Sequence, residues 1–296
     1  MVTLSRSSLP LKRLILTLEM IKFEHSVFAL PFALTGALLA IRETGGGPPW
    51  AKLGWIVLAM VAARSAAMAF NRLVDAGIDA RNPRTQTRHI PAGLLSRTFA
   101  WGFVAVSSLL FLLAARALNP LCFRLAPVAL AIVFCYSYTK RFTALSHLVL
   151  GLALGIAPAA AWIAITGSLD PRILWLTAAV TFWTAGFDII YACQDYEFDS
   201  HEGLFSIPKA LGLRGALLVS KLFHAAMVAA LFVLVRSLDL GSLSVAGIGV
   251  VAALLIYEHS LVRADDFSRV NAAFFTMNGY VSMLFFLFWA ADVLLS

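Results

Sequence analysis

Nine long apolar runs constrain the fold of this sequence more than any other feature. Each has about 20 residues or more, the length that a helix needs to cross the hydrocarbon core of a bilayer. The runs are continuous and lack the two-residue alternation of a barrel strand, so only helices can satisfy their backbone groups in lipid. Their expected ranges are 14–41, 52–75, 97–117, 120–139, 145–167, 171–195, 213–236, 241–260 and 271–294. The sequence therefore predicts an all-α, multi-span transmembrane bundle of about nine helices, in one domain over residues 1–296.

The charge content agrees with this class. Only 13% of the residues are charged and 60% are hydrophobic, whereas a soluble domain carries about 25% charged residues. The net charge of +7 would suit a nucleic-acid-binding protein, but the basic residues lie in short loops between the apolar runs. Such loops follow the positive-inside rule, so we expect a lipid bilayer around the chain and no nucleic acid partner. The three cysteines lie within apolar runs and are interpreted as buried hydrophobic residues.

The loop charges also predict an orientation. With the N-terminus placed inside, the inner segments hold sixteen Lys and Arg residues and the outer segments six, while Arg64 lies within a span. This bias predicts a cytoplasmic N-terminus, and an odd number of spans then places the C-terminus outside. The first run begins after several basic residues, as a signal peptide does, but its apolar part is too long for one. We interpret it as a retained span.

Two acidic stretches end apolar runs. The first, residues 71–79 (NRLVDAGID), spaces Asn71, Asp75 and Asp79 four residues apart, which keeps them on one side of a helix. The second, residues 191–199 (YACQDYEFD), repeats this spacing 120 residues later with two aspartates. Charged side chains at the edge of a membrane span are costly and indicate function. Both stretches are expected on the cytoplasmic face.

The repeat extends beyond the acidic residues. Each stretch is followed by a polar loop, an Ile-Pro pair and a new apolar run. Both copies run in the same direction, which predicts a parallel internal repeat with halves at roughly 14–140 and 141–260, plus a last helix at 271–294. Two such helices that meet across a pseudo-twofold axis would bring four carboxylates into one cluster.

Four close carboxylates need cations to stay ionised. Oxygen ligands at this density suit Mg²⁺, which shares its coordination shell with substrate phosphates, and no His or Cys spacing indicates zinc. The expected metal ligands are Asn71, Asp75, Asp79, Asp195 and Asp199. The loop after the first stretch supplies groups that could clamp a diphosphate, namely Arg81, Arg84, Arg88 and His89. The alternative is that these loop residues are solvated surface charges.

Other polar residues leave two interpretations each. Arg64 and Asp188 precede Asn71 and Asp195 by seven residues and lie deeper in their runs. They either form a structural ion pair, or Arg64 binds the carboxylate of a second, smaller substrate that Asp188 helps to position. The segment 136–141 (YSYTKR) at the inner end of the fourth run is either an interfacial anchor or a contact to a diphosphate.

The stretch NRLVDAGID followed by RHIP, the segment YSYTKR, and DIIYACQDYEFD followed by SIP resemble the UbiA superfamily of intramembrane prenyltransferases. The resemblance covers nearly the whole chain and is strongest to the 4-hydroxybenzoate polyprenyltransferase branch. Arg72 departs from the first family motif, in which a second aspartate is common at this position. The second motif matches at Asp188, Tyr191, Asp195 and Asp199. The resemblance implies that Tyr136 and Lys140 contact the diphosphate, together with Arg81 and Arg88.

The resemblance implies Mg²⁺-dependent transfer of a polyprenyl group from polyprenyl diphosphate to a small aromatic acid, by default 4-hydroxybenzoate, in ubiquinone synthesis at a bacterial inner membrane. Lys140 would stabilise the leaving diphosphate, and Asp75 and Asp195 would act with it as catalytic residues, Asp195 as the proton acceptor. Aromatic faces would stabilise the allylic cation, with Tyr136, Tyr138, Phe187 and Tyr191 as candidates. The acceptor would contact Arg64, Lys22, Asp188 and Tyr191.

Two alternatives remain open at this point. A dihydroxynaphthoate of menaquinone synthesis could replace 4-hydroxybenzoate as the acceptor, because it would use similar residues. A secondary transporter, from another functional class, would also suit parallel repeats with intramembrane charges. The sequence does not predict the length of the prenyl chain or the oligomeric state.

Overall fold

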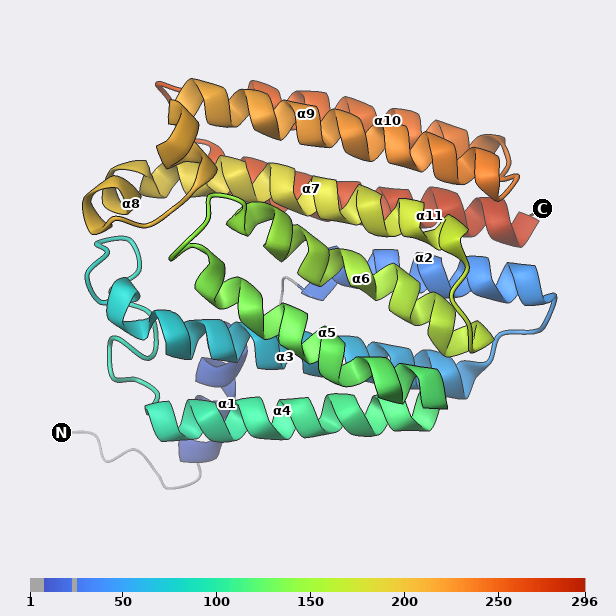
Figure 1. Ribbon diagram of the computed structural model, residues 1–296, viewed down its shortest axis with the longest axis horizontal. Coiled ribbons are helices and arrows are strands. Elements are labelled where there is room, and N and C mark those ends of the chain that lie inside the picture. Colours follow the sequence, from blue (N-terminus) through green and yellow to red (C-terminus); the bar gives the residue numbers. More distant parts are fainter. Residues whose placement is uncertain (1–7, 23–25, 296) are drawn as a thin grey trace.

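The computed structural model describes residues 8–22 and 26–295, and nearly all of this part is helical. The long helices lie roughly side by side, and α1 runs across them (Figure 1). The described elements are α1 (Ser8–Met20), α2 (Ser26–Thr44), α3 (Trp50–Asp79), α4 (Arg97–Leu118), α5 (Pro120–Thr139), α6 (Ser146–Thr166), η2 (Pro171–Ile173), α7 (Leu174–Ala192), η3 (Cys193–Asp195), α8 (Tyr196–Glu202), α9 (Ile207–Ser237), α10 (Ser242–Ser260), η4 (Ala272–Met277) and α11 (Asn278–Leu295).

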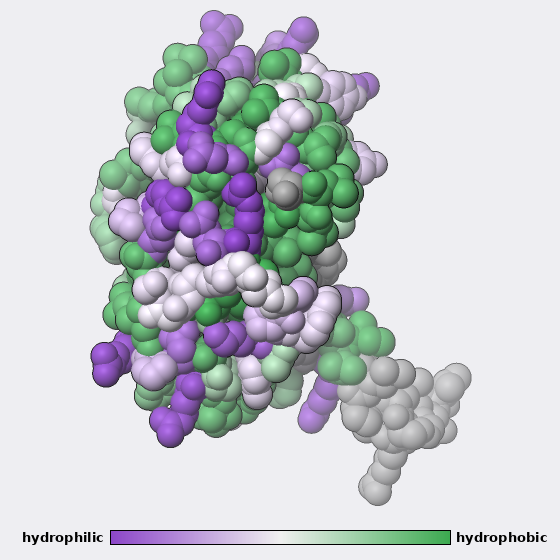
Figure 2. Space-filling view, turned by 90° about the vertical axis from the view of Figure 1, so that its right-hand side faces the viewer, coloured by the Kyte–Doolittle hydropathy of each residue, from purple (hydrophilic) through white to green (hydrophobic). Residues whose placement is uncertain are grey.

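The predicted multi-span bundle is confirmed. Eight helical segments of the described chain, from α3 to α11, are long and apolar enough to cross a membrane. The 19-residue helix α2 packs beside them against α6 and α11. Figure 2 looks onto the end of the bundle at the right of Figure 1, where hydrophilic side chains gather while hydrophobic ones cover much of the flanks. This distribution is the one that a bilayer around the helices requires.

The first predicted run differs from the structure, because residues 14–41 form parts of two helices and not one span. α1 ends at Met20, and Lys22 has a positive φ of 50°, a left-handed conformation that ends helices. Two arginines of α3 hold this end: Arg72 Nε donates to the carbonyl of Met20 (3.3 Å), and Arg64 Nη1 donates to the carbonyls of Ile21 and Lys22 (3.2 and 3.1 Å). These bonds satisfy carbonyls that a helix C-terminus leaves unpaired. Arg72, which departs from the family motif, therefore anchors α1.

Most other boundaries follow from local capping signals. The Ser96 hydroxyl accepts a hydrogen bond from the Phe99 amide (3.1 Å) at the start of α4. The Asn119 side chain accepts one from the Cys122 amide (2.8 Å) ahead of α5, with proline at the first helical position. Gly167 ends α6 with a φ of 77°, which glycine adopts without strain. The predicted boundaries of α4, α5 and α6 are therefore within one residue of the observed ones.

Close packing around α6 fixes the position of the neighbouring helices. A Cβ on Gly151 would lie 2.3 Å from the Thr181 carbonyl oxygen of α7, and one on Gly36 of α2 would lie 2.4 Å from that of Pro158. Small residues at such contacts let membrane helices approach closely. An aromatic core forms where these helices meet α11, with the ring of Phe32 4.8 Å from the rings of both Trp183 and Phe285. The cavity described next lies where α6 and α7 face α3 and α5.

Candidate active site

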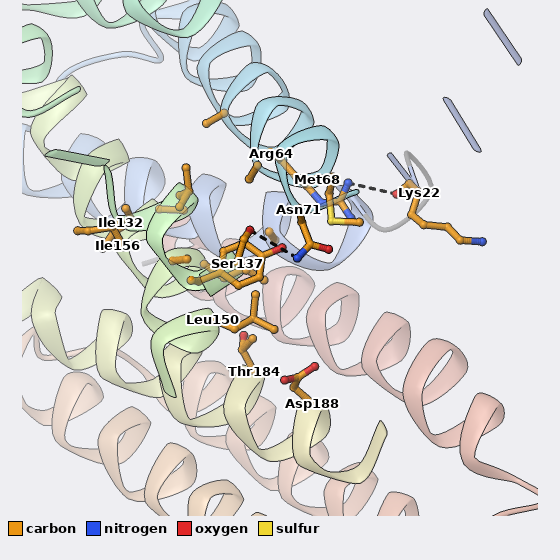
Figure 3. A pocket seen from close by; sticks show the side chains of 18 of the residues that line it. Lys22, Arg64, Met68, Asn71, Ile132, Ser137, Leu150, Ile156, Thr184 and Asp188 are labelled. Carbon is orange, nitrogen blue, oxygen red and sulfur yellow. Dashed lines mark hydrogen bonds between the residues drawn. The ribbon is translucent and has the colours of Figure 1, made fainter. Parts of the chain in front are cut away.

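One cavity of about 1010 Å³ extends from the two acidic stretches into the bundle. Its walls come from α3, α5, α6 and α7, and η4 closes one side. Figure 3 shows residues of α3 facing residues of α7, with side chains of α5 and α6 between them. The acidic end is lined by Asn71, Asp75, Asp79, Asp188, Asp195 and Asp199, and the deeper part by apolar residues that include Ile132, Leu150, Leu154, Ile156 and Ala157. The cavity can therefore hold a molecule with an anionic head and an apolar tail.

Asp75 is the centre of the first acidic stretch. Asp75 is buried, with only 2% of the residue exposed. The carboxylate accepts hydrogen bonds from Lys140 Nζ (2.6 Å), Asn71 Nδ2 (3.0 Å) and Arg141 Nη2 (3.3 Å). Lys140 follows directly after α5, so the end of α5 brings its ammonium group to α3. Tyr136 lines the same cavity one helical turn before Lys140.

Asp79 lies one turn further along α3. Its Oδ1 atom accepts a hydrogen bond from Arg88 Nη1 at 2.7 Å. Its Oδ2 atom is buried and has no hydrogen-bond partner within residues 8–22 and 26–295. Arg81, which the sequence suggested as a second diphosphate contact, instead pairs with Glu202 of α8 at 2.8 Å, and its side chain is 56% exposed. The structure therefore places Arg88 in the cavity lining and Arg81 outside it.

The loop after the first stretch holds the second one. Arg84 donates from Nε to Asp195 Oδ1 (2.9 Å) and from Nη2 to Oδ2, and Asn82 Nδ2 also donates to Oδ1 (3.0 Å). Arg84 Nη1 donates to the Tyr191 hydroxyl (3.0 Å). Burial lowers the pKa of Arg84, but the hydrogen bonds and attraction of Asp195 outweigh this and raise that pKa above its ordinary value. Arg84 therefore stays charged between the two halves of the repeat.

Asn82 was missed by sequence reasoning, and Arg84 was grouped with the other loop arginines. The available signal was the segment Asn-Pro-Arg three residues after Asp79. It could not reveal its partner, because Asp195 lies more than 100 residues away in the chain.

The backbone of the second acidic stretch corrects the expected geometry. The four-residue spacing holds along one helix at Asn71, Asp75 and Asp79, but α7 ends at Ala192, and Asp195 ends the 3-10 turn η3. Gln194 Nε2 donates to the Tyr191 carbonyl (3.1 Å), an oxygen that a continuing helix would bond to the amide of residue 195. Asp199 therefore lies in the separate helix α8, and the repeat is not exact.

The four carboxylates share one cavity but do not form one cluster. Among the described residues, no three Asp, Glu, His or Cys side chains are grouped as a ready metal site. Cations separate them, with Lys140 on Asp75, Arg88 on Asp79 and Arg84 on Asp195. The donor set still fits Mg²⁺, since all its members are hard oxygen ligands and Asp79 Oδ2 has no partner in the described chain.

His147 is a site residue that sequence reasoning missed. The amide of Ile207 donates to its Nε2 atom (3.4 Å), so that atom carries no proton, and Nδ1 donates to Asp188 Oδ2 (2.7 Å). This geometry places the proton of His147 on Nδ1, where it orients the Asp188 carboxyl group. Of the two interpretations for Arg64 and Asp188, the structural ion pair is wrong, because Asp188 pairs with His147. Figure 3 shows Arg64 and Asp188 on facing walls of the cavity. The only sequence signal was a polar pair, Ser146-His147, at the start of an apolar run.

Arg64 and Lys22 were both expected to bind the acceptor. Arg64 lines the cavity on α3, close to Met68 and Asn71 (Figure 3). Lys22 contributes its carbonyl group to Arg64, while its ammonium group points away from the other labelled residues (Figure 3). Both residues line the cavity, and of the two side chains only that of Arg64 lies among the other labelled residues (Figure 3).

An aromatic wall completes the site. The ring of Phe274 lies 4.2 Å from that of Tyr191 and 5.3 Å from that of Phe187. Phe274 belongs to η4, a π-helical segment of the kind often found at functional sites. Asn278 Nδ2 donates to the Phe274 carbonyl (2.9 Å). Tyr138, an expected member of this wall, instead meets Phe70 edge-on at 5.9 Å and lies outside the cavity lining.

The phenylalanine pair Phe274-Phe275 also escaped sequence reasoning. Both residues lie at the start of the last apolar run, where further hydrophobic residues carry no distinguishing pattern.

Comparisons with known proteins agree with this geometry. Residues 29–289 match the UbiA prenyltransferase family. The chain is 32% identical over 250 residues to a 4-hydroxybenzoate octaprenyltransferase of Vibrio atlanticus, covering 82% of this chain and 87% of that protein. It superposes on a UbiA homologue from Aeropyrum pernix K1 with a TM-score of 0.82 and 35% identity, covering 91% and 98% of the two chains. A UbiA homologue from Archaeoglobus fulgidus, solved with GPP and Mg²⁺, shares the fold with a TM-score of 0.68 and 22% identity, over 94% and 99% of the chains.

These matches set the transporter alternative aside, because they cover most of the chain and the family is one of enzymes. The acidic stretches, the helical bundle and the comparisons agree. The chain belongs to the UbiA prenyltransferase family, and it is an integral membrane prenyltransferase.

Proposed function

We propose that the protein transfers a polyprenyl group from polyprenyl diphosphate to 4-hydroxybenzoate, and that Mg²⁺ takes part in the reaction. The observation that carries the proposal is the single cavity that joins two cation-paired acidic stretches to an apolar chamber. The relative from Vibrio atlanticus, which is named for this acceptor, supports the choice of aromatic acid. The homologue solved with GPP and Mg²⁺ supports a prenyl diphosphate and a divalent cation.

The acidic end binds the diphosphate in this proposal. Mg²⁺ held by Asn71, Asp75, Asp79, Asp195 and Asp199 would supply Lewis-acid stabilisation of the diphosphate. The chain supplies the rest of the positive charge through Lys140, Arg84 and Arg88, all of which line the cavity. Lys140 donates hydrogen bonds to the diphosphate oxygens as the allylic C–O bond breaks and negative charge grows on them.

The aromatic wall faces the carbon end of the breaking bond. The π-faces of Tyr191, Phe187 and Phe274 attract the allylic cation, and their contact with one another excludes water that would capture it. The prenyl tail then lies along the apolar residues of α5 and α6. This arrangement explains why the reaction takes place in a membrane protein, since the tail enters from lipid.

The acceptor binds between α3 and α7. Arg64 pairs with the carboxylate of the aromatic acid, and the ring attacks the allylic carbon beside its hydroxyl group. The ring proton then passes to Asp188, whose Oδ1 atom makes no hydrogen bond within the described chain while Oδ2 is held by His147 Nδ1. Asp195, the earlier candidate for this step, is less available because Arg84 binds both of its oxygens.

The loop charges support one orientation of the chain in the membrane. The active site and the N-terminus face the cytoplasm of a bacterial inner membrane, and the C-terminus faces outward. The partners are polyprenyl diphosphate, a small aromatic acid and the bilayer.

The test is a panel of aromatic acids, including 4-hydroxybenzoate and a dihydroxynaphthoate, given to the purified protein in lipid nanodiscs with one polyprenyl diphosphate. Mass spectrometry of the products is expected to show prenylated 4-hydroxybenzoate, and its formation should stop with EDTA and return with Mg²⁺. Arg64→Ala should raise the KM for the acceptor, whereas Glu202→Gln, outside the cavity, should leave it unchanged. A dihydroxynaphthoate product with no 4-hydroxybenzoate product would refute the choice of acceptor.

A further inference from the structure

A second cavity, of about 430 Å³, lies between α9 and α10. α9 begins shortly after the second acidic stretch, and α10 ends beside the start of α9, so this cavity lies at the same end of the bundle as the acidic residues (Figure 1). It shares no lining residue with the large cavity. Its lining consists of Arg214, Leu217, Leu218, Lys221, His259, Ser260, Val262, Arg263 and Ala264.

The charges of this lining are all of one sign. Arg214, Lys221 and Arg263 carry three positive charges, and no carboxylate lines the cavity. None of these three side chains forms an ion pair with a described residue. Three acidic residues are close to the lining in sequence: Glu258, which is fully buried, and Asp265 and Asp266. The Asp266 carboxylate accepts a hydrogen bond from the Ser268 amide (2.9 Å) and also attracts Arg263. Asp266 offsets part of the Arg263 charge from outside the lining, and the cavity still presents a net positive charge.

The apolar residues around the cations show what kind of anion fits. Leu218 and Leu222 on α9 are exposed, as are Ile256 and Tyr257 on α10. Ile256 lies one helical turn before Ser260, deeper in the bundle, and Leu222 lies directly after Lys221. Cations at the end of two membrane helices with exposed apolar side chains one turn deeper match a lipid, which has an anionic head above apolar chains.

His259 adds a polar atom to the cavity. His224 Nε2 lies 3.3 Å from the Trp183 carbonyl, which can only accept, so that nitrogen donates, and the neutral His224 accepts at Nδ1 from His259 Nε2 (3.0 Å). His259 Nδ1 is then an acceptor, and it is buried without a partner in the described part of the chain.

We propose that the cavity between α9 and α10 binds the headgroup of an anionic phospholipid whose phosphodiester is held by Arg214, Lys221 and Arg263. One guanidinium group can bind two phosphate oxygens through two parallel hydrogen bonds. The proposal does not depend on the identity of the aromatic acceptor.

The experiment measures retained lipid by native mass spectrometry after titration of the purified protein with phosphatidylglycerol or phosphatidylcholine. The pocket variant Arg214→Gln/Lys221→Gln/Arg263→Gln is compared with Arg116→Gln/Arg124→Gln/Arg236→Gln, which removes equal charge from exposed positions outside both the pocket and the active site. Wild type and control should retain phosphatidylglycerol over phosphatidylcholine, and the pocket variant should lose about tenfold or more in affinity for phosphatidylglycerol.

Two results would overturn the proposal. One is unchanged phosphatidylglycerol affinity in the pocket variant, and the other is full displacement of the bound lipid by inorganic phosphate or glycerol 3-phosphate, which would indicate a site for a soluble phosphate. If the triple variant fails to fold, Lys221→Gln and Arg263→Gln are measured singly, and each should weaken phosphatidylglycerol binding about fivefold. Equal affinity of both single variants and wild type would likewise refute it.

Discussion

Lys140 allows the sharpest test of the site, because its neighbour Arg141 serves as a matched control. Both side chains bind the buried Asp75 carboxylate, Lys140 at 2.6 Å and Arg141 at 3.3 Å, and both are about one-third exposed. Only Lys140 lines the cavity. We therefore expect Lys140→Met to slow the chemical step and Arg141→Met to have little effect on it.

The magnitude follows from the contact. A hydrogen bond to a charged group is worth about 1.5–3 kcal/mol, and each 1.36 kcal/mol of barrier changes a rate about tenfold. Loss of the bond from Lys140 to the leaving diphosphate should thus lower kcat about 10- to 150-fold. Arg141→Met should lower it by less than about threefold, because the Arg141 contact to Asp75 is long and solvent screens it.

The assay is the rate of diphosphate release at saturating donor and acceptor, with thermal unfolding in detergent as a control for folding. The acceptor KM should stay the same in both variants, since neither residue lies near Arg64 in the proposed site. A kcat of Lys140→Met within twofold of the wild-type value, or an equal loss of kcat in Arg141→Met, would refute the role given to Lys140.

Four further changes give expected outcomes. Asp195→Asn should reduce turnover about 100-fold and raise the Mg²⁺ concentration that gives half-maximal activity, because a neutral amide is a weaker metal ligand. An unchanged Mg²⁺ dependence in an activity titration would contradict the metal role of Asp195. Ala157→Phe should fill the apolar part of the cavity and reduce turnover of a long-chain donor more than turnover of geranyl diphosphate. Equal losses of turnover with the two donors would mean that the prenyl tail binds elsewhere. Asp292→Ala should lower the free energy of unfolding by about 3 kcal/mol. The reason is that the Asp292 carboxylate accepts hydrogen bonds from the amides of Gly241 (2.7 Å) and Leu243 (3.1 Å) and from Ser244 Oγ (2.9 Å) at the start of α10. A change of less than about 1 kcal/mol in thermal unfolding would refute the role of Asp292 as a cap. Glu258 is 0% exposed, and both of its carboxylate oxygens and Asn278 Oδ1 lack hydrogen-bond partners in the described chain, so we expect a protonated Glu258 that donates to Asn278. Glu258→Gln should keep transferase activity within about threefold, and Glu258→Ala should lower it about tenfold. Equal activity of the two variants would show that this pair does not support the Phe274 wall.

The sequence alone determined the class of fold and the helix face that carries the first acidic stretch. Hydrocarbon cannot satisfy backbone polar groups, so continuous apolar runs of this length must be helices. The ranges of these runs placed both ends of α4, α5 and α6 within one residue. Asn71, Asp75 and Asp79 could be placed on one helix face because the four-residue spacing is a local property of a helix. The family motifs added Lys140 and Tyr136, whose roles composition alone left open.

The tertiary structure decided which charges meet. Arg84 and Asn82 bind Asp195, His147 binds Asp188, and Arg72 binds the end of α1. Each contact joins segments that are far apart in the sequence. No periodicity in one segment encodes such partners, because they depend on how separate helices pack. This is why the sequence left two interpretations for Arg64 and Asp188, and why it did not reveal the cations that pair with Asp75, Asp79 and Asp195. Helix spacing fixes where a side chain points, and only helix packing fixes what it meets there.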